Sequence, residues 1–343
     1  RKKGENQLFG FVASCVDDRF LPKGEKLLEK LTDLLGEFCC NPITRGGRLL
    51  EEYVESEREN LADLIRSDIN DKRSYAARRL LEEMCAGERY GVGRMGAAKD
   101  VEKISFQKLN SYYLDILPKG RLELFYCGSA PEKRVAGAFT RAFAALPRQG
   151  GLEPAATIRR PAREPFQVVV DEMDVSQGKL CIGFRTDSAD IPATMLMNAM
   201  FGGTSNSKLF LNVREKLSLC YYAGSAYHRL KGLITVSSGI EFENYDRAVE
   251  EIFRQLEALQ KGEWEDWELT GARESLLSSL RTMEDSPSSL EDFVGGQAAA
   301  GSGETIPGLI AALQGVTPQR IREAAQAVKP DTIYFLKGKE AQA

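Results

Sequence analysis

The chain has 343 residues, of which 43% are hydrophobic and 28% are charged, and its formal net charge is −4. This composition is ordinary for a globular protein of about two domains. The slightly acidic charge gives no indication of a nucleic-acid partner or of binding to a membrane surface. No apolar run approaches the roughly 20 residues that a membrane-spanning helix needs. The sequence therefore predicts a cytoplasmic protein with no membrane and no nucleic-acid partner.

Histidine, the side chain that most often acts as a general base or binds transition metals, is almost absent. His228 is the only histidine, so this stretch contains neither a Ser-His-Asp triad nor a site of several histidines, unless His228 serves alone. We expect His228 at the surface or in a hairpin. The seven cysteines include no CxxC pair, and most lie in apolar stretches. This pattern favours buried free thiols in a reducing compartment over a cysteine zinc site.

The first part of the chain predicts mainly helices. Four stretches carry apolar residues at helical spacing: 23–40, 46–86 with a break near 68–71, 103–115 and 131–146. Residues 5–16 and 121–127 have the composition of strands. Residues 147–165 hold four prolines and several charges with little apolar periodicity, which predicts a linker.

The linker separates an N-terminal domain, 1–146, from a C-terminal domain, 166–343. In the second domain we expect strands at 166–173, 178–185, 220–228, 231–240 and 332–336. We expect helices at 190–201, 206–219, 244–261, 264–282, 286–300, 306–314 and 317–328. Runs of strands followed by runs of helices predict an α+β class, with helices packed on one face of a mainly antiparallel sheet.

Both parts end in a similar way. In each, a helix and a turn that contains proline precede a strand with an aromatic pair, Phe125-Tyr126 in the first and Tyr334-Phe335 in the second. This similarity predicts a duplicated domain with a repeat of about 210 residues. The first copy lacks the strands that open the second, so we expect the N-terminal domain to be truncated at its start.

Residues 198–225 hold an ordered set of features. Gly202 and Gly203 form a turn after an apolar helix, and a Ser-x-Leu-Phe stretch at 207–210 opens the next helix. Arg214 lies on that helix, and Tyr221 follows seven residues later at the start of a strand. In this ordered set, and more loosely over the whole chain, the sequence resembles the pitrilysin/insulinase family of zinc peptidases, which includes the mitochondrial processing peptidase.

The resemblance is sharper for one bacterial branch of the family, which lacks the inverted zinc motif. The stretches that carry it are 71–76, 83–85 and 213–216. Membership implies two homologous α+β domains of the LuxS/processing-peptidase-like metallohydrolase fold. Chains of this branch tend to accompany a sister protein that carries the zinc.

In the family, an Arg/Tyr pair holds the substrate backbone and helps to polarise the scissile carbonyl. The resemblance therefore implies that Arg214 and Tyr221 bind substrate, with Gly202 and Gly203 in the turn before the site helix. A guanidinium and a phenol O–H are donors that can stabilise negative charge on a carbonyl oxygen. The structural alternative is that Arg214 makes a surface salt bridge and Tyr221 packs in the core.

Active members of the family bind zinc through a His-x-x-Glu-His motif and a later glutamate. The motif would fall before residue 1, and because the sequence does not begin with Met we expect it to be part of a longer protein. The later glutamate lies in a helix that reads Glu-Arg-x-x-Val-x-x-Glu, seven residues after the first glutamate, and the matching stretch is 57–64. The ligand position is then Leu64, which cannot bind zinc, although a slip of one residue would place Asp63 there. We expect no metal on this chain and no catalytic residue on this chain alone.

Three functions are compatible with these residues. The leading hypothesis is a non-catalytic, substrate-binding subunit of a heterodimeric zinc peptidase. A zinc-bearing sister subunit would complete the site, and a peptide or unfolded polypeptide would bind at a sheet edge as an added strand. One alternative is an active zinc metallopeptidase whose zinc motif lies upstream of residue 1. The other is a structural or assembly protein with no peptide chemistry, as among the respiratory-complex core proteins of this family.

Overall fold

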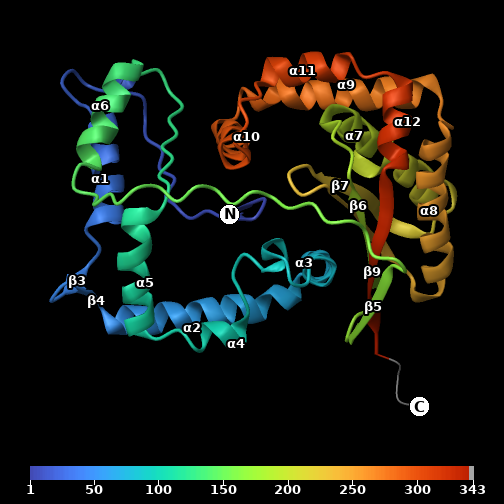
Figure 1. Ribbon diagram of the computed structural model, residues 1–343, viewed down its shortest axis with the longest axis horizontal. Coiled ribbons are helices and arrows are strands. Elements are labelled where there is room, and N and C mark those ends of the chain that lie inside the picture. Colours follow the sequence, from blue (N-terminus) through green and yellow to red (C-terminus); the bar gives the residue numbers. More distant parts are fainter. Residues whose placement is uncertain (340–343) are drawn as a thin grey trace. The chain divides into compact units, whose positions relative to one another are not determined.

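The computed structural model describes residues 1–339, and contacts divide the chain into two compact units. Unit 1 comprises Arg1–Lys2, Gln7–Ser67 and Arg94–Ala155. Unit 2 comprises Lys3–Asn6, Asp68–Gly93 and the chain from Ala156 onward (Figure 1). The domain limits drawn from the sequence stay a prediction, but this division shows that residues 68–93 pack with the second half of the chain. Within residues 1–339, no helix combines the length and the apolar character needed to cross a membrane.

Unit 1 consists mainly of helices. They are α1 (Leu27–Cys40), α2 (Glu51–Ser67), α4 (Ala98–Val101), α5 (Phe106–Lys119) and α6 (Glu132–Ala142), with a 3-10 turn at Asp18–Phe20. A short ribbon of β3 (Thr44–Arg45) and β4 (Arg48–Leu49) precedes α2. The predicted helix at 46–86 therefore begins later than expected, because Gly46 and Gly47 have φ angles of 60° and 74° and turn the chain back on itself.

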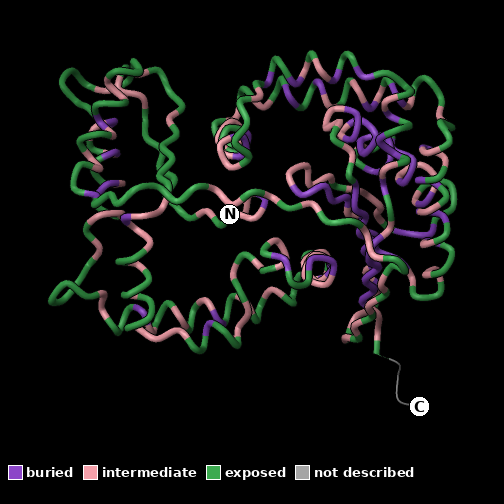
Figure 2. The backbone as a smooth tube through the Cα atoms, in the orientation of Figure 1, coloured by how far each residue is buried: buried purple, intermediate pink, exposed green. Residues whose placement is uncertain are grey.

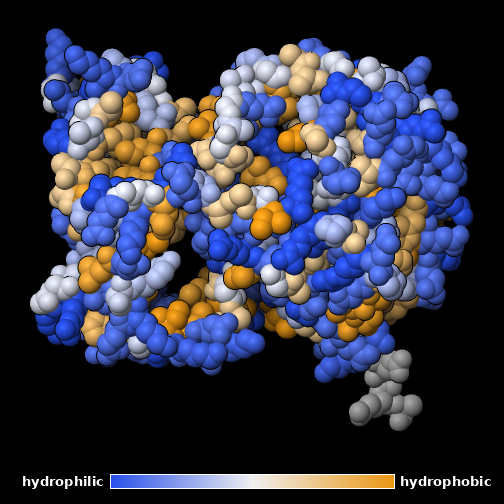
Figure 3. Space-filling view, in the orientation of Figure 1, coloured by the Kyte–Doolittle hydropathy of each residue, from blue (hydrophilic) through white to orange (hydrophobic). Residues whose placement is uncertain are grey.

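The two strands predicted at 5–16 and 121–127 are wrong for most of their length. In the first, β2 (Asn6–Gln7) pairs with β1 (Lys2–Lys3), and neither 8–16 nor 121–127 is in a strand. A strand is stabilised by hydrogen bonds to a neighbouring strand, and no described strand pairs with these segments. Their apolar side chains are consequently exposed, as in Phe9 at 79%. Figure 3 shows hydrophobic side chains at the surface in this part of unit 1.

Unit 2 contains a five-stranded sheet, which confirms the predicted α+β class. Its strands are β5 (Gln167–Met173), β6 (Gly178–Thr186), β7 (Cys220–His228), β8 (Leu233–Ile240) and β9 (Val328–Gly338). Their order is β5-β9-β6-β8-β7. The pairs β6–β8, β6–β9 and β7–β8 are antiparallel, and β5–β9 is parallel. Strand β7 is therefore an edge strand of this sheet.

One face of the sheet is covered by α7 (Ile191–Asn198), α8 (Tyr245–Lys261) and α12 (Pro318–Gln326), with a 3-10 turn at Phe242–Asn244. Helices α9 (Asp266–Met283) and α11 (Ile306–Gln314) pack against α7, and α10 (Pro287–Ala300) packs against α9. Alternate residues of β6, Leu180, Ile182 and Phe184, point into the core that these helices form. Figure 2 shows that buried positions concentrate in this sheet and the helices beside it.

The other face of the sheet is covered by α3 (Lys72–Met84), a helix from the first half of the chain. Its Ala76 and Leu80 pack with Cys181 of β6 and Tyr334 of β9. The approach is close at Gly183, where a Cβ atom would lie 2.5 Å from the Met84 sulfur. The prediction of helices on one face thus holds for the second half of the chain, and α3 adds a second layer from outside it.

The order of the helices repeats along the chain. Helix α9 starts 215 residues after α2, at Asp266 and Glu51, and α10 starts 215 residues after α3, at Pro287 and Lys72. This spacing agrees with the predicted repeat of about 210 residues.

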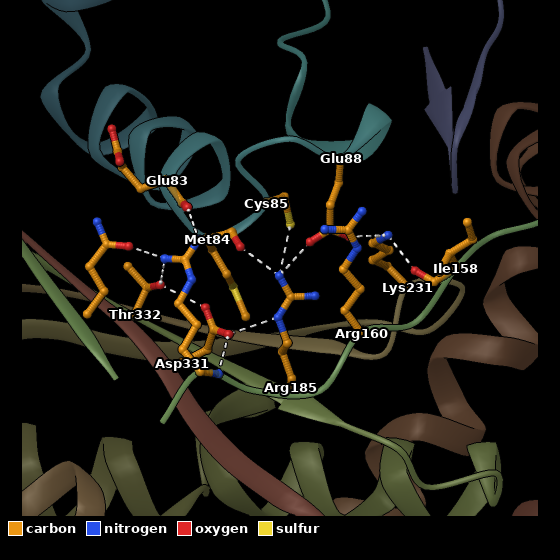
Figure 4. A network of polar contacts seen from close by, with 12 residues as sticks. Glu83, Met84, Cys85, Glu88, Ile158, Arg160, Arg185, Lys231, Asp331 and Thr332 are labelled. Carbon is orange, nitrogen blue, oxygen red and sulfur yellow. Dashed lines mark hydrogen bonds and ion pairs between the residues drawn. The ribbon is translucent and has the colours of Figure 1, made fainter. Parts of the chain in front are cut away.

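A buried network of charges fastens residues 83–88 to the sheet (Figure 4). Arg185 of β6 donates from Nη2 to Oε1 of Glu88 at 2.7 Å and to the carbonyl oxygen of Met84 at 2.6 Å. Its Nε donates to Oδ2 of Asp331 at 2.9 Å. Lys231 is fully buried and pairs with Oε2 of Glu88 at 2.6 Å and with Glu5. Each buried charge thus has an opposite partner, which offsets its loss of hydration.

The β7–β8 hairpin belongs to the same contact region. His228, the last residue of β7, lies in a hairpin as expected, and it is partly buried rather than free at the surface. Its ring nitrogens lie 3.1 Å from the hydroxyl of Tyr90 and 3.1 Å from that of Thr235. Burial lowers the pKa of His228 below its ordinary value, which favours the neutral imidazole in the folded protein.

We expect Glu88→Ala to lower the free energy of unfolding by about 3–5 kcal/mol at pH 7, because it leaves Arg185 and Lys231 buried without a shared carboxylate. Urea unfolding measures this loss, with Glu243→Ala at an exposed site as the control. An unchanged urea midpoint for Glu88→Ala would contradict the structural role of the network.

The same variant has a defined pH dependence. Burial raises the pKa of Glu88, but hydrogen bonds from Lys231 and Arg185 outweigh it, so the pKa lies below its ordinary value of 4.5. The unfolded chain therefore takes up the proton first as pH falls, and the carboxylate stabilises the fold above about pH 4.5. The difference between wild type and Glu88→Ala should shrink below that pH.

Candidate functional site

The chain between α7 and β7 contains two π-helical segments. Helix α7 continues into η4 (Ala199–Gly203), and η5 (Leu209–Lys216) replaces most of the helix predicted at 206–219. Hydrogen bonds from residue i to i+5 are rare, and they occur frequently at functional sites. Gly202 and Gly203, which were predicted to form a turn, are the last two residues of η4.

Gly202 lets η4 approach β7 closely. A Cβ atom at this position would lie 2.7 Å from the backbone nitrogen of Ser225 and 2.8 Å from its Oγ. Ser225 also donates from Oγ to Oδ1 of Asn198 at 2.8 Å. The glycine is therefore required by packing between the π-helical turn and the strand that carries Tyr221.

Segment η5 is anchored to α8 and α9 by buried polar contacts. Lys208, just before η5, pairs with Oε1 of Glu268 at 3.0 Å. Asn212 donates from Nδ2 to Oε1 of Gln255 at 2.9 Å, and Gln255 donates to Oε1 of Glu251 at 2.6 Å. These contacts fix the backbone from which Arg214 projects.

The turn from η5 into β7 is tight and strained. The backbone N–H groups of Leu217 and Leu219 donate to the carbonyls of Asn212 and Val213, at 3.1 and 3.0 Å. Ser218, between them, has φ of 50° and is the one non-glycine residue with positive φ among residues 1–339. Such a conformation costs a residue with a Cβ roughly 1–2 kcal/mol, and strained residues of this kind cluster at functional sites.

The two predicted substrate-binding residues lie on either side of this turn, and both are accessible. The side chain of Arg214 is 40% exposed, lies 4.7 Å from the ring centre of Phe210, and pairs with Glu215 at 3.3 Å. Tyr221 is 61% exposed and donates its hydroxyl to Oε1 of Glu241 at 2.7 Å. That hydrogen bond raises the pKa of Tyr221. Tyr221 therefore does not pack in the core, whereas Arg214 does form a surface ion pair.

Tyr221 occupies an irregularity in the edge strand. Cys220 pairs with Ile240 and Tyr222 pairs with Gly239, so Tyr221 is the extra residue of a β-bulge. Bulges at sheet edges re-aim side chains and are common beside binding sites. Because β7 is an edge strand of the described sheet, its outer backbone groups have no strand partner there.

The position matched to the zinc ligand of active relatives lies on α2. Leu64 is 54% exposed, and Asp63 pairs with Arg66 at 2.9 Å. Arg66 also pairs with Glu102 at 2.7 Å, beside a cavity of about 350 Å³. Among residues 1–339, no group of three or more His, Cys, Asp or Glu side chains could hold a metal ion. The residues present at this position do not fit zinc.

Sequence reasoning missed several residues of the site. The register of β7 and β8 brings Glu241 to Tyr221. Pairing the two predicted strands outward from the turn between them would have indicated this contact. Ser218 and the Lys208–Glu268 pair carry no recognisable signal in a single sequence.

We expect Ser218→Gly to raise the free energy of unfolding by about 0.5–1 kcal/mol, because glycine adopts positive φ without strain. Ser176→Gly, at an exposed residue with ordinary φ, is the matched control and should lower it. Urea unfolding of both variants measures the contrast, and a loss of stability in Ser218→Gly equal to that of the control would contradict the strained turn.

Comparisons with known proteins agree on one family. The family model described as "Peptidase M16 inactive domain" matches residues 103–276, slightly more than half of the chain. The "Probable inactive metalloprotease YmfF" of Bacillus subtilis strain 168 is 34% identical over 345 aligned positions, which cover 99% of this chain and 80% of the relative.

Solved structures are similar as well. A conserved protein from Enterococcus faecalis V583 has a TM-score of 0.84 at 25% identity, covering 96% of this chain and 78% of that one. A peptidase M16 inactive domain from Pseudomonas fluorescens has a TM-score of 0.72 at 16% identity, covering 92% and 76%, and shows the fold alone. Together with the sequence matches, these findings confirm the predicted family: the chain belongs to the peptidase M16, or pitrilysin/insulinase, family.

Proposed function

We propose that this chain is a non-catalytic, substrate-binding subunit of a heterodimeric zinc peptidase. Its substrate is a peptide or an unfolded polypeptide, and the zinc is carried by a sister chain. The observation that carries the proposal is the placement of Arg214 and Tyr221. Both are accessible on either side of one strained turn, on backbone that is anchored to the core of unit 2.

The chemistry of the pair suits a peptide backbone. The Arg214 guanidinium and the Tyr221 hydroxyl are donors, and a peptide carbonyl oxygen is the acceptor that an extended substrate offers in quantity. The free edge of β7 offers backbone hydrogen bonds to an added strand. Glu241 accepts from the Tyr221 hydroxyl, so a bound carbonyl would replace that carboxylate as the acceptor.

Two observations support a non-catalytic role. The position matched to the third zinc ligand is Leu64, and the neighbouring Asp63 is engaged by Arg66. The chain also matches the model of the inactive M16 domain and is similar to a relative named as a probable inactive metalloprotease. A peptidase built from this chain would thus need metal chemistry from elsewhere.

We expect Arg214→Ala and Tyr221→Phe each to weaken peptide binding by about 10-fold, because each removes one hydrogen bond to the substrate backbone. Fluorescence anisotropy with fluorescein-labelled β-casein, an unfolded polypeptide, measures the dissociation constant of the complex between β-casein and the full-length protein.

Two exposed residues provide matched controls. Arg247→Ala removes an exposed arginine from α8, and Tyr112→Phe removes the hydroxyl of a tyrosine that is exposed as fully as Tyr221, at 61%. Both controls should bind β-casein like the wild type. If the site variants also bind like the wild type, or if none of the proteins binds β-casein, the proposal fails and a purely structural role becomes the better account.

A further inference from the structure

A second group of residues lies beside the Tyr221 bulge, on the face of the sheet that α3 covers. Arg73 is the second residue of α3, and its guanidinium carbon lies 4.2 Å from the ring centre of Tyr222. Lys179 of β6 donates to Oε1 of Gln177 at 2.6 Å. A Cβ atom on Gly239 would lie 2.6 Å from the Tyr222 ring and 3.0 Å from Oε1 of Gln177. The groups that the two cations contact therefore lie side by side at Gly239, and the charge of Arg73 acts on Lys179.

Neither cation has a carboxylate partner within residues 1–339. The Arg73 guanidinium lies over the Tyr222 ring, and Lys179 donates to an uncharged amide. The two nearby carboxylates have other donors. Asp71 caps α3 by accepting from the backbone of Arg73 and Ser74, and Glu241 accepts from Tyr221.

Electrostatics at this spot favour an added anion. Burial lowers the pKa of Lys179, the charge of Arg73 lowers it further, and Glu241 opposes both. Two like charges held together raise the free energy of the folded protein, and an anion placed between them relieves that cost.

We propose that Arg73 and Lys179 form a carboxylate-binding subsite that extends the peptide site beyond Arg214 and Tyr221. The inference rests on the proposed function and adds a substrate preference to it. The subsite selects peptides that place a carboxylate next to the residue bound at Tyr221. That carboxylate is either an Asp or Glu side chain or the free C-terminus, because both present the same pair of oxygens to the two cations.

Four fluorescein-labelled dodecapeptides of Ala, Ser, Val and Gln test the inference. They share one sequence and differ in having a central Glu or Gln and a free or amidated C-terminus. Anisotropy on the complete protein should show about 5- to 10-fold tighter binding of peptides with the selected carboxylate. Tighter binding of the peptides with Glu would show that the subsite binds an acidic side chain. Tighter binding of the peptides with a free C-terminus would show that it binds the terminal carboxylate.

Variants test whether the two cations cause this preference. Arg73→Gln and Lys179→Gln should each bring the ratio of dissociation constants, without and with the selected carboxylate, toward 1. The affinity for the peptide with Gln and an amidated C-terminus should stay unchanged. Arg73→Lys should retain it, which a purely structural role of Arg73 would not predict. Arg247→Gln and Lys133→Gln, at exposed sites, control for total charge, and urea midpoints control for folding.

The outcomes separate the subsite from the proposed function. Equal affinity of the wild type for all four peptides, or a preference that persists in both Gln variants, would overturn the subsite. If Arg214→Ala still weakened binding of every peptide in that case, the proposed function would stand without the subsite. Failure of all four peptides to bind would overturn both.

Discussion

Strand β6 is buried on both of its faces, and the arrangement of unit 2 depends on that burial. On one face Leu180, Ile182 and Phe184 enter the helical core, and on the other Cys181 meets helix α3. Gly183 permits the close approach of Met84. A shift of β6 by one residue would move these three large side chains to the face where α3 lies close to Cys181 and Gly183, and there is no room for them there. The register of β6 with its neighbours is restricted in this way.

The charge network acts at the same interface. Arg185 projects from β6 toward residues 84–88, and Glu88 bridges it to Lys231 in the turn of the β7–β8 hairpin. The network therefore joins the strand in the middle of the sheet, the hairpin and the segment that follows α3. The rigid sheet places the bulge at Tyr221 opposite Glu241, and the anchors on α8 and α9 place Arg214. A binding pair held by packed elements retains its geometry better than one on a free loop.

Much of unit 2 could be predicted from the sequence, because its strands and helices have clear local periodicity and its turns carry glycine or proline. The ordered residues from Gly202 to Tyr221 were sufficient to indicate the family. Most of the strand expected at 5–16 and all of the strand expected at 121–127 are absent, because strand pairing depends on a neighbour that local composition does not reveal. The apolar spacing of α3 indicated a buried face but not its partner, the sheet of the second half. The π-helical turns leave no signature at helical spacing, and the contact between Tyr221 and Glu241 depends on cross-strand register.

The proposed function joins a substrate-binding role for Arg214 and Tyr221 to a position on α2, Leu64, that cannot bind zinc. Its most direct test is the zinc content of the protein as its gene encodes it, purified without added metal and measured by elemental analysis. A non-catalytic subunit should hold far less than one zinc per chain once it has been separated from any chain that co-purifies with it, and the zinc should be found in that other chain. About one tightly bound zinc per chain would contradict the assignment of Leu64 and would make the protein a metallopeptidase in its own right.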